Sequence, residues 1–165
     1  MASITPGTGT LKSVTLEGAF VEALFLLSIF EGSTTNNPNG TRRLTMTFSP
    51  STKKLTGSWT FDAVPSLDTN GNPIFTVQTH LTGVGFTPGT AVKSTNLPAA
   101  IVELANMINF KEADAAKNPG ANQKITALEN SGEDRSSTGA FDFDLTMTVN
   151  TDGSTKLVGS TYLLD

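Results

Sequence analysis

The fold is decided by Ala19-Phe20-Val21-Glu22-Ala23-Leu24-Phe25-Leu26-Leu27-Ser28-Ile29-Phe30, the most apolar run of the chain. A helix that crosses a bilayer needs about 20 apolar residues, so this shorter run with one charge predicts a helix buried in a folded domain. The same opening and apolar spacing return at Ala100-Ile101-Val102-Glu103-Leu104-Ala105-Asn106-Met107-Ile108-Asn109-Phe110. A removable signal segment should not recur in mid-chain, and the repetition therefore predicts two related buried helices.

Matching residues surround both helices at an almost constant spacing along the chain. Thr5-Pro6-Gly7-Thr8 recurs as Thr87-Pro88-Gly89-Thr90, an offset of 82. After a one-residue deletion the offset becomes 81, which carries Glu31 onto Glu112, and after one insertion it returns to 82, which carries Trp59 onto Phe141. A register held over this length predicts a tandem duplication, with residues 1–86 as the first unit and residues 87–165 as the second.

Each unit is expected to have the element order β-α-β-β-β. Short first strands are predicted at Lys12–Leu16 and Lys93–Leu97, and the helices at about Glu17–Glu31 and Pro98–Lys117. Alternating apolar residues and turn sequences then predict three strands in each unit. These strands are Arg42–Phe48, Leu55–Val64 and Ile74–Leu81 in the first unit, and Gln123–Glu129, Gly139–Val149 and Lys156–Leu164 in the second.

The expected fold class is therefore α+β, with antiparallel sheets that each pack on one helix. A unit of about 80 residues buries little surface alone, so we expect the two units to form one pseudo-twofold pair. A long apolar helix wrapped by an antiparallel sheet is similar to the hot-dog fold in architecture only. Trp59 and Phe141 are expected to occupy equivalent core positions on their strands.

The composition argues against several classes of function. The chain has 165 residues, is 16% charged and carries a net charge of −4, whereas a nucleic-acid-binding surface needs a basic patch. It has no cysteine, which excludes disulfides and thiolate chemistry, and its only histidine is His80. We expect no nucleic-acid partner, no cofactor, no metal site, no membrane span and a cytoplasmic location. The sequence leaves open a metal site formed by carboxylates alone.

Three residues are weak candidates for catalysis. Glu22 and Glu103 interrupt the apolar face of each predicted helix, and a carboxylate in such a place needs a charged partner or takes a raised pKa. Either residue could be a general base. The favoured alternative is that Glu22 pairs with Lys12 or Arg43, as Glu103 does with equivalent lysines, and supports the fold. His80 has no carboxylate beside it in the sequence, which makes it a weaker candidate.

Both helices are expected to present a shared core face, which is Phe20, Ala23 and Leu27 in the first and Ile101, Leu104 and Ile108 in the second. The two helices differ on the flank opposite this face. The first helix carries Phe25 and Ile29 where the second carries Asn106 and Phe110. The first helix is therefore apolar nearly all round, which predicts burial on more than one side. We expect the flank of Phe25 and Ile29, with Glu22 beside it, to meet the other unit, a second chain or an apolar ligand.

Three functions remain open at this stage. The favoured one is a soluble, non-enzymatic module that self-associates, as a homo-oligomer, or binds a small apolar ligand. The second is an enzyme with a cleft between the units and Glu22 or Glu103 as general base. The third is a structural component of a larger assembly, which threonine- and glycine-rich strands would suit.

Overall fold

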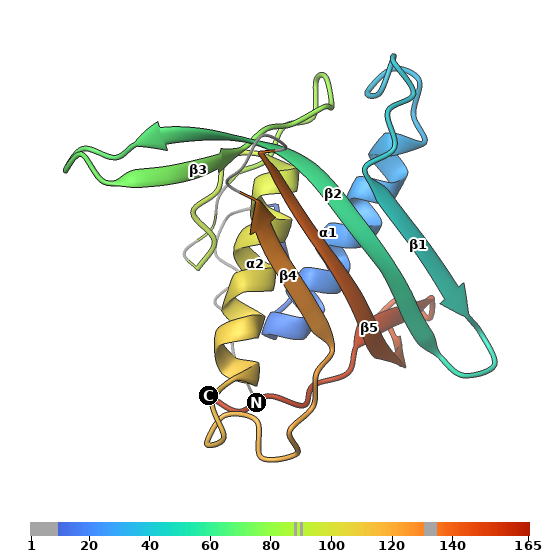
Figure 1. The fold of residues 1–165 in the computed structure, drawn as a ribbon. Coiled ribbons are helices and arrows are strands. Elements are labelled where there is room, and N and C mark those ends of the chain that lie inside the picture. Colours follow the sequence, from blue (N-terminus) through green and yellow to red (C-terminus); the bar gives the residue numbers. More distant parts are fainter. Residues whose placement is uncertain (1–9, 88, 90, 131–134) are drawn as a thin grey trace.

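The computed structural model describes residues 10–87, 89, 91–130 and 135–165 (Figure 1). Within this part the chain runs helix, three strands, helix, three strands. The helices are α1 (Leu16–Glu31) and α2 (Leu97–Glu112). The strands are β1 (Leu44–Ser49), β2 (Lys54–Leu67), β3 (Pro73–Val77), β4 (Ile125–Asn130), β5 (Ser136–Val149) and β6 (Thr155–Gly159).

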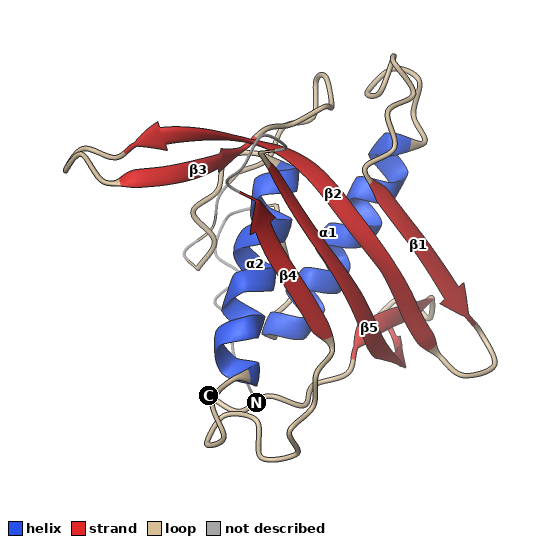
Figure 2. Ribbon diagram, viewed as in Figure 1, coloured by secondary structure: helices blue, strands red, loops and turns tan. Residues whose placement is uncertain are grey.

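The strands form one antiparallel sheet, and the fold class is α+β as expected. The central order is β1-β2-β5-β4, while β3 pairs with β2 and β6 pairs with β5. Strands β2 and β5 are 14 residues long each, and only their first parts pair in the centre. Their second parts continue as two-stranded ribbons with β3 and β6. Figure 2 shows both helices on one face of the central sheet and the β2–β3 ribbon reaching away from it.

The predicted first strands, Lys12–Leu16 and Lys93–Leu97, are wrong. Both segments run as irregular chain into the helices, apart from one bridge residue at Thr15. Their backbone N–H groups bond to a helix carboxylate instead of to a neighbouring strand. The second helix is also shorter than predicted, because it ends at Glu112 rather than at Lys117. The separate sheets that were expected, one for each helix, are a single sheet in which both halves of the chain take part.

Both helices use the core faces that their spacing predicts. The six positions predicted to point inward are fully buried: Phe20, Ala23 and Leu27 in α1, and Ile101, Leu104 and Ile108 in α2. The helices contact each other and lie against strands from both halves of the chain, because α1 contacts β6 and α2 contacts β3. One hydrophobic cluster therefore joins residues 1–86 to residues 87–165.

An aromatic cluster lies where β2 meets β5. Trp59 and Phe141 are buried, as predicted, and stack with ring centroids 6.3 Å apart. Phe20 of α1 meets both edge-on, at 5.9 and 6.0 Å. In the pairing of the two strands, Trp59 lies opposite Gly139, and Phe141 lies opposite Gly57. Each large ring therefore faces a residue without a side chain.

The two glycines are needed for space. A Cβ on Gly139 would lie 2.1 Å from Cζ2 of Trp59, and a Cβ on Gly57 would lie 2.8 Å from Cζ of Phe141 and 2.0 Å from the backbone oxygen of Thr45. Distances below 3.0 Å require the structure to shift. The rings of Trp59 and Phe141 thus occupy the volume that side chains at these cross-strand positions would fill.

We predict that Trp59→Ala destabilises the protein by about 3–5 kcal/mol, because it empties the centre of the core. Gly139→Ala is expected to cost about 1–3 kcal/mol through overpacking. In the Trp59→Ala background the added methyl has room, so the cost of Gly139→Ala should fall below about 1 kcal/mol. Urea unfolding of the two single variants and the double variant measures these terms.

Thr60→Ala is the control, since Thr60 is the exposed neighbour of Trp59 and its replacement should change stability by less than about 0.5 kcal/mol. Additive effects of Trp59→Ala and Gly139→Ala would contradict the contact between the ring and the glycine. A loss well under 1 kcal/mol for Trp59→Ala would contradict its place in the core.

Candidate functional site

The carboxylates of Glu22 and Glu103 hold the chain that enters each helix. Both oxygens of Glu22 accept the backbone N–H of Lys12, at 2.7 and 2.9 Å, and Oε1 accepts Ser13 N at 3.3 Å. Glu103 accepts Lys93 N at 2.8 and 3.1 Å, and its Oε1 accepts the N and Oγ of Ser94 at 3.1 and 3.0 Å. These contacts place a charge where backbone donors would otherwise be unpaired.

The arginine expected to pair with Glu22 pairs elsewhere. Arg43 makes an ion pair of 2.8 Å with Asp62 across the open face of the sheet. The residues 81 or 82 positions later do the same, since Lys124 lies 3.4 Å from Asp144. Asp144 also lies 3.3 Å from Lys54, and the carboxylates of Asp144 and Asp142 raise the pKa of that lysine. This face therefore carries exposed, mutually paired charges.

An apolar groove runs between α1 and the β5–β6 ribbon. Its narrower part has a volume of about 240 Å³, and its wider part, toward the β1–β2 turn, has a volume of about 460 Å³. Phe25 and Leu157 line both parts. We call this feature the α1 groove and define it by its apolar lining, which is Phe25, Leu26 and Ile29 of α1 with Phe48, Met147 and Leu157 of the strands.

The α1 groove brings together three residues that the sequence selected. Glu22, Phe25 and Ile29 line its narrower part. Phe25 is half-buried and packs against the core cluster, while Ile29 is 67% exposed. The flank of α1 thus meets the ribbon that the second half of the chain supplies, and the side chain of Ile29 remains in contact with solvent.

A pocket of about 520 Å³ with both polar and apolar residues in its lining lies at the corresponding place beside α2. Asn106 stands there at the position 81 residues after Phe25, and Glu103 corresponds to Glu22. Lys93, Ser94 and Asn96 also line it. The two pockets have matching positions but differ in polarity, because an asparagine stands beside α2 where Phe25 lines the α1 groove.

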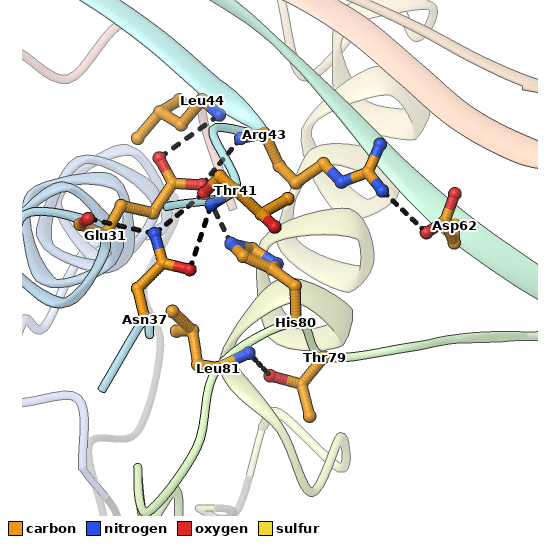
Figure 3. Close-up of polar contacts among 9 residues, drawn as sticks. All are labelled: Glu31, Asn37, Thr41, Arg43, Leu44, Asp62, Thr79, His80 and Leu81. Carbon is orange, nitrogen blue, oxygen red and sulfur yellow. Dashed lines mark hydrogen bonds and ion pairs between the residues drawn. The ribbon is translucent and has the colours of Figure 1, made fainter. Parts of the chain in front are cut away.

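His80 lies away from the α1 groove and binds a buried carboxylate. Its Nε2 is 2.8 Å from Oε2 of Glu31, whose side chain is 1% exposed (Figure 3). A carboxylate only accepts hydrogen bonds, so Nε2 donates. The same carboxylate accepts Arg43 N at 2.7 Å and Leu44 N at 3.3 Å. Glu31 therefore ties the end of α1 to the start of β1 and to the segment after β3.

Glu112 makes the same tie at the end of α2, with tyrosine in place of histidine. It accepts Lys124 N at 2.6 Å and the hydroxyl of Tyr162 at 2.7 Å. Burial, and then the adjacent Glu112 carboxylate, raise the pKa of Tyr162 well above the ordinary 10.0. A charged phenolate beside a buried carboxylate is unfavourable, which is the physical cause of this direction.

A buried asparagine closes the turn after each helix. Asn37 Nδ2 donates to the carbonyls of Glu31 and Thr41, at 3.0 and 2.8 Å, as the dashed lines in Figure 3 mark. Asn118 makes the equivalent bonds to the carbonyls of Glu112 and Asn122, at 3.0 and 2.7 Å. The bonds to Glu31 and Glu112 satisfy carbonyls at the helix ends that have no partner within the helix.

Glu17 is a further buried carboxylate, and it has no acidic counterpart in the second half. Its Oε2 accepts Tyr162 N at 2.8 Å and Leu163 N at 3.1 Å. Its Oε1 is buried and has no hydrogen-bond partner among the described residues. Glu17 fastens the last residues of the chain to the first turn of α1.

The sequence search missed Glu31, Glu112 and Glu17 as partners of other residues. A signal was present for two of them, because Glu31 and Glu112 match in the 81-residue register and each ends a helix. His80 and Tyr162 also match in the 82-residue register. Combining the two sets of matches would have predicted that Glu31 contacts His80 and that Glu112 contacts Tyr162. Nothing in the sequence, however, gives the distance between the residues of each pair.

No metal cluster and no membrane helix is found in the part of the chain that the structure describes. It contains no group of three or more His, Cys, Asp or Glu side chains that could hold a metal ion. Neither α1 nor α2, the helices of that part, is long and apolar enough to cross a membrane.

Comparison of the chain with models of protein families, with curated proteins and with solved structures finds no match. The function must therefore be argued from the chain's own residues. Two features are available for that argument: the α1 groove, and the paired glutamates that hold the helix ends.

Tyr162 is the only tyrosine of the chain, so its ionisation can be followed directly. Since its pKa is higher in the fold than in the unfolded chain, its contribution to stability is complete below about pH 10 and is lost as the pH rises through the folded-state value. We predict little tyrosinate absorption from the folded protein at about pH 11. The protein in urea should titrate near the ordinary value, and a native titration near pH 10 would contradict the contact with Glu112.

We predict that His80→Tyr, which copies the second half, keeps the bond to Glu31 and changes stability by less than about 1 kcal/mol. His80→Ala should cost about 1.5–3 kcal/mol, because a buried carboxylate loses a partner. Urea unfolding near neutral pH measures both variants. Tyr162→His is the matched exchange in the other half, and a His80→Ala variant as stable as the parent protein would show that the contact contributes nothing.

Proposed function

We propose that this protein binds a small apolar ligand in the α1 groove. The observation that carries the proposal is the lining of that groove: half-buried Phe25 and Leu26, with Leu157 opposite, around space that no side chain fills. Ligand pockets in proteins have volumes of about 300–1,000 Å³ and mainly apolar walls. The wider part of the groove, of about 460 Å³, lies within that range.

The contrast between the two helices supports this use. Both helices bury the same core positions, so packing alone does not require Phe25 where α2 has Asn106. An apolar side chain that is kept partly exposed costs solvation free energy unless something covers it. A ligand that binds reversibly in the groove would cover Phe25 and would explain why this position is a phenylalanine.

We also propose that the chain is a tandem duplication, with residues 1–86 and 87–165 related by a near-twofold rotation. The support is the pairing of β2 with β5, in which Ser58 lies opposite Ala140, its match in the 82-residue register. The neighbouring pairs are related in the same way, because Trp59 pairs with Gly139, and their matches, Phe141 and Gly57, pair with each other. The matched contacts of Glu31 and Glu112 give further support. In this scheme the pocket beside α2 has Asn106 where the α1 groove has Phe25.

The function that we infer is non-enzymatic. Glu22 and Glu103 already accept backbone N–H groups, and His80 is held by Glu31. A general base must have a lone pair directed at the proton that it removes, and the carboxylates of Glu22 and Glu103 are instead directed at backbone N–H groups. This favours binding over the cleft enzyme that the sequence left open.

Self-association is the second candidate, and a specific observation favours it. Ile29, Met147 and Val149 are 67%, 57% and 70% exposed, and the first two line the α1 groove. Exposed apolar residues that adjoin a groove are a common feature of protein interfaces. A homo-oligomer, or a place in a larger assembly, would cover the same surface that a ligand enters.

We predict that 1-octanol binds the protein and shifts the methyl resonance of Met147, one of four methionines, because this residue lines the α1 groove. The resonance of Met107 on α2 should not move. Phe25→Asn should weaken octanol binding by about tenfold or more, which corresponds to losing one well-buried aromatic contact. Methyl NMR on protein labelled at methionine measures both effects.

Phe110→Asn is the matched control, because it makes the same exchange at an 81% exposed site of α2. Light scattering over a range of protein concentrations reports self-association in parallel. If Phe25→Asn leaves stability, oligomeric state and octanol response unchanged, the flank of α1 only faces solvent and both candidates fail. A change in oligomeric state alone would select self-association.

A further inference from the structure

The wider part of the α1 groove is bordered by a lysine in an unusual backbone conformation. Lys53 is the last residue of the turn between β1 and β2, and it lines the groove together with Phe48 and Pro50 of the same hairpin. Its φ angle is +53°. Residues other than glycine, asparagine and aspartate seldom adopt this left-handed conformation, because the Cβ crowds the following carbonyl.

The backbone contact made at position 53 does not explain why the residue there is a lysine. The carbonyl of Lys53 accepts Leu145 N at 2.8 Å, and this bond helps to join the hairpin to β5. A glycine would present the same carbonyl and would adopt the conformation without strain. Strained residues that persist in a fold often serve its function, so the explanation is sought in the side chain of Lys53.

Charge is distributed unevenly along the groove. Lys53 lines only the wider part, whereas Glu22 and Lys156 line only the narrower part, and Phe25 lines both parts. The wider part has no acidic residue in its lining, and no ion pair joins Lys53 to another residue of the described chain. The Glu22 carboxylate is held by Lys12 N and Ser13 N, and Lys156 belongs to the same part of the lining. The narrower part therefore carries one charge of each sign, whereas the wider part carries a positive charge alone.

We infer that the ligand of the α1 groove is an aliphatic monoanion, such as a carboxylate with a saturated chain. Its chain lies along Phe25 and Leu157, and its charged group is at the wider end beside the ammonium group of Lys53. At the narrower end the attraction of Lys156 for an anion is offset by repulsion from the Glu22 carboxylate, which disfavours the reverse orientation. This inference rests on the function proposed above and adds the sign of the ligand's charge and its direction in the groove.

The same position in the second half carries a cation in the same conformation. Arg135, 82 residues after Lys53, has a φ angle of +41°, and its carbonyl accepts Ala63 N at 2.8 Å. Both hairpins thus retain a basic residue where glycine would be unstrained. The pocket beside α2 does not include Arg135 in its lining, whereas the α1 groove includes Lys53.

Three probes with one eight-carbon chain test the inference on the full chain: octanoate, 1-octanol and octylammonium. Lys53→Gln should weaken octanoate by roughly threefold to fivefold, the size of a partly exposed ion pair. It should change octanol binding by less than about twofold and should not weaken octylammonium. Replacing octanoate by decanoate should tighten binding by roughly fourfold for each added methylene while the chain stays within the groove.

Lys93→Gln is the control, because it removes the same charge beside the other helix. Lys53→Gly supplies a second readout, since it relieves the backbone conformation while deleting the side chain. The expected result for Lys53→Gly is an unchanged or raised Tm together with weaker octanoate binding. A purely structural lysine would give unchanged octanoate binding, and that result would overturn the inference.

The outcomes separate the two proposals. If octanol and octanoate both bind and Lys53→Gln affects neither, or if octylammonium binds most tightly, the assignment of an anionic ligand fails and the apolar-binding function stands. If none of the three probes moves the Met147 resonance, the proposed function fails, and the anionic ligand fails with it. An equal loss of octanoate binding for Lys53→Gln and Lys93→Gln would indicate an effect of the protein's net charge rather than of a contact with Lys53. That result would also overturn the inference.

Discussion

The pairing of β2 with β5 is the contact on which the rest of the structure depends. Trp59 and Phe141 each cover a glycine of the opposite strand and stack on each other, while Phe20 covers both from α1. A slip of one residue would turn the buried rings to the open face of the sheet. The register of the central strands, and with it the face on which both helices pack, is therefore set by where two glycines leave room for two rings.

The ends of the helices are held by a different kind of interaction. Burying a carboxylate is costly unless several donors satisfy it, and Glu31 and Glu112 each meet backbone N–H groups and one ring donor. Each glutamate joins three segments that are distant in the sequence. The aromatic centre fixes which strands pair, and these carboxylates fix how each helix end meets the strand that follows it.

Much of this fold could be predicted from the sequence, because its apolar residues recur at the spacings of helices and strands. The helical spacing of Phe20, Ala23 and Leu27 gave the correct core face, and alternation placed Trp59 and Phe141 inside. The short segments before the helices were misassigned, since a carboxylate from the helix takes the N–H groups that a strand would need.

The candidate site was less predictable. The sequence selected Glu22, Phe25 and Ile29, which do share one pocket. It could not show that Leu157 and Met147 complete the wall, because the ribbon that carries them bends toward α1 only in three dimensions. The conformation of Lys53 was also invisible, since a lysine gives no sequence signal for positive φ.

The comparison between the halves gives the strongest argument for where function lies. Positions that hold the fold match closely between the halves. Glu31 and Glu112 make equivalent contacts, and so do Asn37 and Asn118. Phe25 and Asn106 differ at positions that face pockets rather than the shared core. The contacts at the helix ends are shared by the two halves, so they do not account for the difference between Phe25 and Asn106. The exchange of Phe25 for Asn106 is therefore the difference between the halves on which the proposed ligand of the α1 groove depends.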